Sequence, residues 1–370
     1  MVDTKSADFI AYVHLAYGYD ALKWQKNWHN GKLLGLNEEF PYGYQYAAQL
    51  GTSVVYSKDY PEGRFQKLVR YGFRWLLGFD AFHAWYNRHE ILNADVVWTH
   101  TESQSLAVLF LFLISNRTPP KIIAQSVWLI DAWPRLNRFH KMLYKKLLAK
   151  ADILTFLSPL NAQEASKLFP GLRSEFVKFG INTDYEASRR APNEKAKIRV
   201  LSVGNDRHRD WQTLIDSVSG ADDIEVRLVT STYKLRTKHD NVSVVKVNLN
   251  PELLALYEWA DMLVLPLKPN LHASGITVVE EAAILGVPVI CSKVGGLESY
   301  FNDSEVIYVD PFDAEQTRTA IRRLAGDAQL QEMLVANAKR RLVEGGLNSK
   351  SFVKRHVDLS RELLQKPRAA

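Results

Sequence analysis

Cysteine and long apolar segments are both scarce in this chain of 370 residues. Its one cysteine, Cys291, cannot form an internal disulfide. This excludes a disulfide-stapled fold and a zinc site built from several cysteines, and it favours a reducing compartment. The longest apolar run, residues 106–114, is less than half of the roughly 20 residues that a membrane-spanning helix needs. The N-terminal residues lack the apolar core of a signal peptide, so we expect a soluble, cytoplasmic protein.

Nucleotide-binding and metal-binding motifs are missing as well. The sequence contains no P-loop and no G-x-G-x-x-G after its first predicted strand, so ATPase and dinucleotide-binding functions lose their main support. It has no H-E-x-x-H motif and no Asp-x-Asp pair, and we therefore expect no metal ion and no tightly bound cofactor. Hydrophobic residues make up 46% and charged residues 24%, which is average for globular proteins and excludes a disordered or coiled-coil chain.

The formal net charge of +6 lies in one half of the chain. Residues 1–180 contain 21 Lys and Arg against 15 Asp and Glu, whereas the remaining residues contain 26 of each. Seven of the nine tryptophans also precede residue 180. This asymmetry indicates that the first half meets an anionic surface, such as lipid headgroups or a phosphorylated substrate.

Short apolar runs alternate with segments of helical periodicity, which is typical of parallel strands joined by helices. We predict strands at 9–15, 52–56, 96–99, 122–126, 153–157 and 176–179, and again at 198–203, 225–229, 243–247, 262–265, 287–291 and 306–309. The pattern predicts an α/β fold with two Rossmann-like, doubly wound domains. The charged stretch 186–197 lacks a hydrophobic period and is the expected boundary. We therefore expect domains at 1–185 and 186–350, followed by a helix at 351–370 that can pack back on the first domain.

The segment 264–291 is suited to phosphate binding. A strand ends near Pro266, a loop follows, and the sequence SGIT at 274–277 opens a helix. A helix N-terminus offers free N–H groups and a partial positive charge, and Gly275 lets a ligand approach closely. Glu281, further along this helix, can accept hydrogen bonds from a ribose diol. Taken alone, Glu281 is better explained as an acid that complements the helix dipole; its surroundings shift the interpretation toward ribose binding.

Five segments together resemble the group 1 glycosyltransferases of family 4, retaining enzymes with the GT-B fold. These are the segment 264–291, the inter-domain strand FVKFGINTDYE at 176–186, LSVGNDRHRDWQTLIDSV at 201–218, NPELLALYEWADMLVLP at 250–266 and DVVWTHTESQSL at 95–106. They follow one another in the order and spacing of the family. The resemblance implies that the second domain binds a nucleotide-diphosphate sugar, and that the sugar is transferred with retention of its anomeric configuration to an acceptor on the first domain.

The resemblance also implies which residues bind the donor. Negative charge grows on the leaving diphosphate, and in the family an Arg and a Lys in a G-R-x-x-x-K-G loop stabilise it. Here the loop is one residue shorter; Arg209 takes the Lys position and Arg207 replaces the Arg. A solvated charge run is the alternative for this loop, and it fits His208 better than it fits the two arginines. The expected donor-binding residues are Gly204, Arg207, Arg209, His272, Ser274, Gly275, Ile276, Thr277 and Glu281, with Arg209 and Glu281 also catalytic.

His100 is the third expected catalytic residue, because a His at this place in the family lies near the transferring sugar. Its alternative role is to cap the helix that follows. Expected acceptor contacts are Tyr17, Tyr19 and Asp131. In one departure, the family's first acid is replaced by Ala273, so contacts to the sugar hydroxyls must come from the N–H groups at 274–277 or from His272.

Two basic stretches account for the charge of the first half. Residues 64–88 place aromatic and aliphatic side chains on one helical stripe, with five cations and one acid, and residues 134–150 carry six cations and no acid. Basic amphipathic helices with Trp and Phe are typical of proteins that lie on anionic membranes. Each helix alone is equally consistent with a core-facing stripe and a solvated basic back. Two in one domain favour membrane contact.

The sequence thus predicts a metal-independent hexosyltransferase in polysaccharide or glycolipid biosynthesis. It is expected to lie at the inner face of the cell membrane, with a nucleotide sugar and a lipid-linked or saccharide acceptor as partners. A sugar-nucleotide 2-epimerase or hydrolase, and a non-catalytic nucleotide-sugar-binding relative suggested by Ala273, remain as alternatives. A nucleic-acid partner is not expected, because only the overall charge favours it and no binding motif is present.

Overall fold

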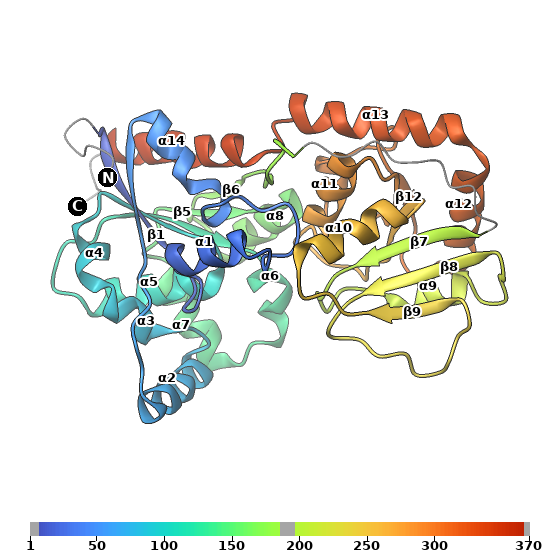
Figure 1. The fold of residues 1–370 in the computed structure, drawn as a ribbon. Coiled ribbons are helices and arrows are strands. Elements are labelled where there is room, and N and C mark those ends of the chain that lie inside the picture. The colour runs from blue at the N-terminus through green and yellow to red at the C-terminus, as the bar shows by residue number, and fades with distance from the viewer. Residues whose placement is uncertain (1–6, 186–196, 366–370) are drawn as a thin grey trace. The chain divides into compact units, whose positions relative to one another are not determined.

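The computed structural model describes residues 7–185 and 197–365, which form two compact units (Figure 1). The first unit takes in the chain up to Lys26, Glu39–Val177 and the chain from Lys350. The second takes in Asn27–Glu38 and Lys178–Ser349. The predicted boundary, 186–197, lies outside the described residues except for Lys197. Residues 27–38 and 178–185, expected in the first domain, are grouped with the second unit.

A parallel six-stranded sheet forms the centre of the first unit, in the order β2-β1-β3-β4-β5-β6. Its strands are β1 (Phe9–His14), β2 (Thr52–Tyr56), β3 (Val96–Thr99), β4 (Lys121–Ser126), β5 (Ile153–Phe156) and β6 (Ser174–Phe176). Its helices are most of α1 (Ala21–His29), α2 (Arg64–Leu77), α3 (Ala81–Tyr86), α4 (Arg88–Asn93), α5 (Glu102–Ile114), α6 (Leu129–Ala132), α7 (Arg138–Leu148), α8 (Pro159–Leu168) and most of α14 (Ser349–Gln365), with 3₁₀ helices at Pro41–Leu50 and Trp133–Arg135. The strand order reverses between β1 and β3, which is where such sheets bind ligands.

A second parallel sheet forms the centre of the other unit, in the order β12-β11-β10-β7-β8-β9. The strands are β7 (Ile198–Val203), β8 (Ile224–Val229), β9 (Val242–Val245), β10 (Met262–Leu265), β11 (Val289–Ser292) and β12 (Ile307–Val309). The helices are α9 (Trp211–Ser217), α10 (Asn250–Trp259), α11 (Ile276–Leu285), α12 (Ala314–Gly326) and α13 (Ala328–Glu344), with a 3₁₀ turn at Leu297–Ser299. Here the order reverses between β7 and β10, so the loops after these two strands flank the expected ligand site.

The twelve predicted strands are all present, and the α/β architecture with two doubly wound sheets is confirmed. The prediction at 176–179 overlaps its strand only at Phe176, because β6 begins at Ser174. The backbone N–H of Phe179 donates to the Tyr300 hydroxyl over 3.0 Å instead of joining the sheet. The longest apolar run of the sequence lies in α5, which is buried in the core. Among the described helices, none is both long and apolar enough to cross a membrane.

The C-terminal helix α14 packs within the first unit. The indole N–H of Trp98, in the central strand β3, donates to the hydroxyl of Ser360 over 2.9 Å. Two ion pairs join β6 or its flank to the same helix: Arg173 with Glu362 at 2.7 Å, and Arg355 with Glu175 at 2.5 Å. A hydrogen bond between buried side chains fixes the helix in register, whereas the half-exposed ion pairs contribute less.

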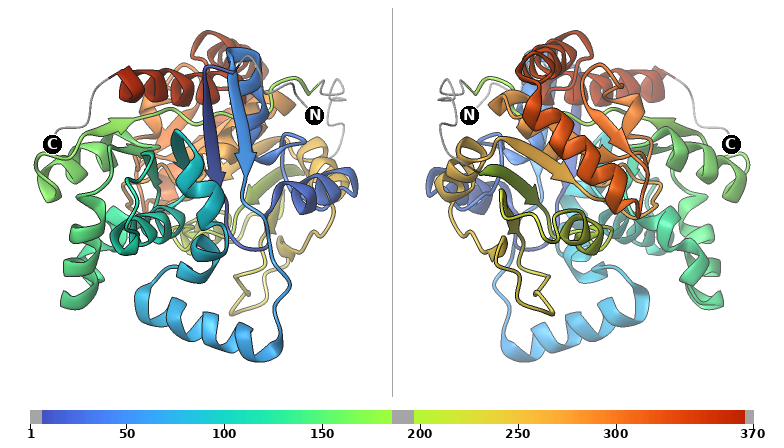
Figure 2. Two further views of the ribbon diagram at one scale, coloured as in Figure 1. Left: turned by 90° about the vertical axis from the view of Figure 1, so that its left-hand side faces the viewer. Right: turned by 90° about the vertical axis from the view of Figure 1, so that its right-hand side faces the viewer.

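The basic stretch 64–88 does not form the single helical stripe predicted for it. Gly78, with a φ of +83°, ends α2, and the Asp80 carboxylate caps α3 by accepting from the His83 N–H. The apolar side chains of α2 face outward: Phe65 is 76% and Trp75 85% exposed. The core-facing interpretation is therefore wrong for α2. Figure 2 shows this helix set apart from the sheet, along the lower edge of both views.

Arg70 holds α2 to the rest of the unit. It is the one fully buried residue of the helix and forms ion pairs with Glu62 and Asp80, both at 2.7 Å. The second basic helix, α7, behaves differently: it buries Tyr144, Leu147 and Leu148 against the core and turns its basic face outward. Of the two basic stretches, α2 alone keeps an exposed apolar face along its whole length.

Candidate functional site

Two loops of the second unit meet at the carboxyl ends of β7 and β10. The loop 204–210 follows β7, and the loop 266–275 follows β10. The backbone joins them through hydrogen bonds from Asp210 N–H to Pro266 O at 3.0 Å and from Lys268 N–H to His208 O at 2.8 Å. Because the strand order reverses at this point, the loops form the ligand-binding edge expected of a doubly wound sheet.

Arg209 lies between these two loops. Its side chain is buried, with Nε donating to Val203 O at 3.0 Å and Nη1 donating to Ser274 Oγ at 2.9 Å. A Cβ at Gly204 would overlap the guanidinium, and one at Gly275 would lie 3.2 Å from it, so both glycines make room for this side chain. Burial lowers the pKa of Arg209 to about 10, partly offset by Asp206 and Tyr257, and leaves the group cationic at neutral pH.

The guanidinium of Arg209 has N–H donors that are not used by the described residues. In the described part of the chain no carboxylate forms an ion pair with it, and Nη2 makes no hydrogen bond. A buried cation without a bonded anion is costly unless a ligand supplies the negative charge. The arrangement therefore favours an anionic ligand beside Ser274 and Gly275.

The N-terminus of α11 offers further donors to the same place. Gly275 precedes the helix with a φ of +82°, and Ala273 adopts a φ of +54° that is unusual for a residue with a Cβ. The N–H of Ser274 donates to Asn270 Oδ1 at 3.2 Å, and the N–H of Ile276 donates to Ala273 O at 3.2 Å. The N–H groups of Gly275 and Thr277 have no acceptor among the described residues. Together with the helix dipole, they suit a phosphate group.

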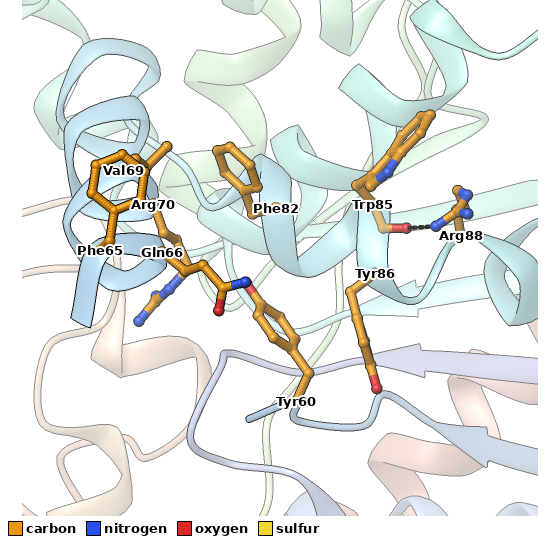
Figure 3. A pocket seen from close by; sticks show the side chains of 9 residues that line it. All are labelled: Tyr60, Phe65, Gln66, Val69, Arg70, Phe82, Trp85, Tyr86 and Arg88. Atoms are coloured by element: carbon orange, nitrogen blue, oxygen red, sulfur yellow. Dashed lines mark hydrogen bonds between the residues drawn. The ribbon is translucent and has the colours of Figure 1, made fainter. Parts of the chain in front are cut away.

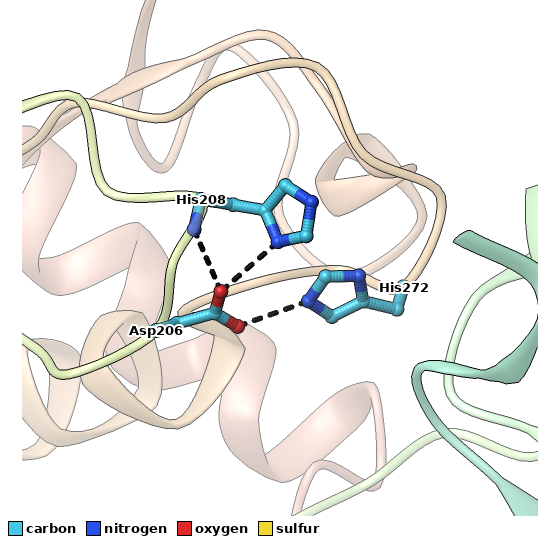
Figure 4. Close-up of side chains that lie close together, drawn as sticks. All are labelled: Asp206, His208 and His272. Carbon is cyan, nitrogen blue, oxygen red and sulfur yellow. Dashed lines mark hydrogen bonds and ion pairs between the residues drawn. The ribbon is translucent and has the colours of Figure 1, made fainter. Parts of the chain in front are cut away.

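Three side chains next to Arg209 form a second polar group, which we call the Asp206 cluster: Asp206, His208 and His272 (Figure 4). One carboxylate oxygen of Asp206 contacts His208 Nδ1 at 3.0 Å and accepts from the His208 N–H at 2.8 Å. The other contacts His272 Nε2 at 3.0 Å. Burial alone would raise the pKa of Asp206, but the hydrogen bonds from both histidines lower it well below its usual range. The solvated alternative for His208 is wrong, since His208 is buried and bonded to Asp206.

The Asp206 cluster is also the set of described residues that could hold a metal. One ligand atom from each residue lies within 4.8 Å of the others. Two imidazoles and a carboxylate form a donor set that zinc accepts. The carboxylate, however, already contacts both rings, so the three groups satisfy one another without an ion.

Glu281 is the acid of α11 expected to bind ribose. Its carboxylate accepts from the Tyr257 hydroxyl at 2.9 Å and from the Leu36 N–H at 3.3 Å. Burial raises the pKa of Glu281 to about 7, although these two hydrogen bonds oppose the shift. The carboxyl therefore changes its ionisation near neutral pH. A carboxylate that only complements the helix dipole would not need the hydrogen bond that the Tyr257 hydroxyl donates to Glu281 Oε2. This bond therefore favours a positioned, ligand-binding carboxylate.

The segment Asn27–Glu38 reaches Glu281 from far along the chain. Gly35 N–H donates to Asn250 Oδ1 at 2.7 Å, and Asn250 N–H donates to Gly31 O at 2.6 Å, so the segment is fixed to the start of α10. At Gly35 a Cβ would overlap the Glu281 carboxylate. Sequence reasoning missed this segment, because its contacts join residues more than 200 positions apart.

His100, in the first unit, lies under aromatic side chains. Its ring stacks on Tyr42 at a centroid distance of 3.4 Å, and its Nδ1 contacts the Tyr44 hydroxyl at 3.3 Å. Burial lowers the pKa of His100 to about 3, and nearby His356 adds to the effect, so the imidazole is neutral at pH 7. In the helix-capping alternative His100 would cap α5, but the N-cap residue is Thr101, and Gln104 Oε1 accepts from the backbone N–H groups of His100 and Thr101.

The placement of the remaining predicted residues, Arg207, Tyr17, Tyr19 and Asp131, bears less directly on their expected roles. Arg207 is exposed, and its side chain makes no hydrogen bond or ion pair with any residue that the structure describes. The Tyr17 hydroxyl donates to Tyr60 O at 2.7 Å, while Tyr19 is 52% exposed. Asp131 lies half-buried in α6. The structure thus brings together the predicted donor residues of both loops, apart from Arg207.

Comparisons with known proteins agree with this geometry. Residues 187–341 match the family model described as glycosyl transferases group 1. An uncharacterized glycosyltransferase of Methanocaldococcus jannaschii is 30% identical over 128 residues, which is 34% of this chain and only 32% of that relative.

Solved structures extend the similarity to the whole fold. Sucrose-phosphate synthase from Thermosynechococcus elongatus has a TM-score of 0.72 at 17% identity, covering 96% of this chain and 99% of its own. HepE from Anabaena, solved in complex with UDP-glucose, has a TM-score of 0.67 at 11% identity, covering 96% and 100%. The chain therefore has the GT-B glycosyltransferase fold predicted for it, and its second unit matches the group 1 glycosyltransferases over residues 187–341.

Proposed function

We propose that this protein is a retaining glycosyltransferase that moves a hexosyl group from a nucleotide-diphosphate sugar to an acceptor. The proposal rests mainly on Arg209, a buried cation without a bonded carboxylate among the described residues, which lies beside the N-terminus of α11. The family match over residues 187–341 supports it, as does the similarity to a protein solved with UDP-glucose.

The site residues have distinct roles in this reaction. Arg209 and the N–H groups of Gly275 and Thr277 bind the diphosphate, and Glu281 accepts hydrogen bonds from the ribose. As the bond between the sugar and the diphosphate breaks, negative charge grows on the leaving phosphate oxygens. Fixed cationic and N–H donors stabilise that charge more in the transition state than in the ground state. Since Arg209 and the helix supply positive charge, we propose that no metal ion takes part.

We further propose that the first unit takes a lipid-linked or saccharide acceptor at the inner face of the cell membrane. The exposed apolar side chains of α2 lie next to Arg64, Lys67 and Arg74, and the helix contains no acid. Helices of this kind lie in the interface of anionic bilayers. On the acceptor side, Tyr17, Tyr19, Asp131 and His100 remain the proposed contacts.

Release of free nucleoside diphosphate tests the proposal. Purified protein is incubated with UDP-, GDP-, ADP- and dTDP-sugars, with and without membrane extract, and NMR of the product reports its anomeric configuration. We expect one donor class to bind and to turn over when an acceptor is present, giving a product with the donor's configuration. Failure to bind any nucleotide sugar would refute the proposed function, and inversion would refute retention.

Ala273 supports a second candidate, a non-catalytic nucleotide-sugar-binding protein. The family places an acid here that contacts the donor sugar, whereas Ala273 is buried and presents only a methyl group. Donor binding without turnover in the presence of extract, together with no release of free sugar, would favour this candidate over the transferase and over an epimerase or hydrolase.

A further inference from the structure

An apolar groove lies between α2, α3 and α5 in the first unit. It has a volume of about 420 Å³ and is lined by apolar and aromatic residues, including Phe73, Leu76, Phe82, Trp85, Phe110 and Ile114. Phe73, Leu76 and Ile114 are each about half exposed, at 48%, 51% and 48%. A groove of this size is within the range that holds small ligands, and its lining offers no partner to a polar one.

A second pocket adjoins this groove, because Phe82 and Trp85 line both. It has a volume of about 310 Å³ and also contains Tyr60, Tyr86 and two arginines (Figure 3). Arg70 is neutralised by Glu62 and Asp80. Arg88 is exposed; it donates to the carbonyl of Trp85 at 2.9 Å, lies 4.7 Å over the Trp85 ring, and forms no ion pair with a carboxylate of the described residues. The apolar groove therefore ends beside a cation.

We propose that the two adjoining pockets bind one anionic lipid, with its hydrocarbon chain in the groove and its phosphate beside Arg88. The groove is lined by apolar side chains and the adjoining pocket contains a cation, which matches the hydrocarbon chain and the charged headgroup of an amphiphile. Burying a chain in the groove would also cover Phe73 and Trp85, whose exposure is otherwise unfavourable.

The charge of the surrounding surface indicates whether the groove binds a lipid or a second copy of this chain. Helix α2 exposes Arg64, Lys67 and Arg74 and contains no acid. A symmetric contact between two copies would bring these positive surfaces together, which is unfavourable. An anionic headgroup complements the same surface. The occupant is therefore an anionic lipid with a phosphate headgroup rather than a second copy of this chain.

This inference deepens the proposed function at the membrane face, but it does not depend on sugar transfer. Lipid binding in the first unit can be measured without a nucleotide sugar, and donor binding in the second unit can be measured without lipid. Failure of one measurement therefore leaves the other interpretable.

Alkyl phosphates below their micelle concentration are the probe, and isothermal titration calorimetry is the measurement. We expect one molecule of dodecyl phosphate to bind per chain, and dodecanol, which lacks the charge, to bind more weakly. Within the length of the groove, each two-carbon extension from octyl to dodecyl phosphate should tighten binding about tenfold, because each buried methylene contributes a similar increment.

Two groove variants and one control locate the site. Ala81→Phe fills the groove, and Ile114→Glu places a charge in it; each should weaken dodecyl phosphate binding about tenfold or more. Leu68→Glu changes an α2 side chain that is 70% exposed and lines neither pocket. It should weaken pelleting with anionic vesicles while leaving dodecyl phosphate binding unchanged. Circular dichroism and nucleotide-sugar binding show whether each variant is folded.

Three outcomes would overturn the proposal. These are no saturable binding of any alkyl phosphate, equal binding in the wild type and both folded groove variants, and binding that does not depend on chain length. A dimer in analytical ultracentrifugation that Ala81→Phe and Leu68→Glu both abolish would assign the face to a second copy instead.

Discussion

Replacing Arg209 by Met gives the sharpest test of the site, because Met fills similar space and removes only the charged fork. Arg209 Nη2 is free for a phosphate oxygen, and Nη1 already holds Ser274. A hydrogen bond to a charged group contributes about 1.5–3 kcal/mol, so the variant should bind a nucleoside diphosphate roughly 10- to 150-fold more weakly. Since the pKa of Arg209 is about 10, this loss should be constant between pH 6 and 8.

Calorimetry with three forms of the preferred ligand separates the phosphate contact from a general disturbance. The nucleotide sugar and the nucleoside diphosphate should both bind Arg209→Met more weakly, while binding of the nucleoside alone stays the same. Arg209→Lys keeps the charge without the fork and should lose less. Arg207→Met provides a comparison, because the side chain of Arg207 forms no hydrogen bond or ion pair with any described residue, and we expect it to have the smaller effect. The reasoning fails if nucleoside binding falls as much as diphosphate binding, or if folded Arg209→Met binds like the wild type.

Three further predictions concern the second unit. Folding raises the pKa of Glu281 to about 7, so the wild type should lose about 3 kcal/mol of stability between pH 4.5 and 7. Glu281→Gln should not show this loss in urea unfolding, and the donor affinity of the wild type should rise over the same pH range. Parallel pH profiles for the two proteins would contradict this prediction. Gly35→Ala should weaken donor binding in calorimetry, because the added Cβ would overlap the Glu281 carboxylate. Gly18→Ala is the control, since Gly18 has nearly the same φ and no neighbour within 4 Å of the added Cβ, and it should only lower the Tm. Equal effects of the two variants on donor binding would contradict a role for the Gly35–Glu281 contact. Dialysis against EDTA should leave donor affinity unchanged and release no stoichiometric zinc; a metal bound by the Asp206 cluster would show the opposite.

The strands were predictable because each is a short run of β-branched and apolar residues, and buried parallel strands need little else. The strand β6 was misplaced for a physical reason that the sequence does not carry. The segment 176–179, Phe-Val-Lys-Phe, is more apolar than Ser-Glu-Phe at 174–176, yet its Phe179 N–H donates to Tyr300, which lies 121 residues away, instead of joining the sheet. Local pattern cannot register a hydrogen bond of that range.

The donor loops were predictable in part. Gly204, Arg209 and Ser274 meet as the resemblance implied, since glycines and cations at the ends of strands are local features. The Asp206 cluster and the segment 27–38 were not foreseen. Asp206 becomes informative only when it is paired with His272, 66 residues away. The segment 27–38 has no motif of its own and joins the site through Asn250 and Glu281.

The orientation of α2 was the other feature that periodicity could not decide. A stripe of apolar residues beside a stripe of cations is the same pattern whether the stripe faces the core or a ligand. What decides is the side on which the helix is anchored, and here the anchor is Arg70, which lies on the cationic side and is buried by Glu62 and Asp80. The acids that bury Arg70 lie outside the helix, so the helix sequence alone is ambiguous.

Net charge located only one of the two anion-binding surfaces that the structure supports. The excess of cations in residues 1–180 reflects exposed side chains, each of which acts through water and is screened by salt within about 10 Å at 0.1 M. The second unit has nearly equal numbers of acids and bases, yet it holds Arg209. A buried cation acts at short range in a medium of low effective dielectric, so one such group binds a phosphate more strongly than several exposed ones. Counting charges therefore finds an exposed basic surface, whereas finding the proposed phosphate site requires knowing which buried cation forms no ion pair with a carboxylate of the described residues.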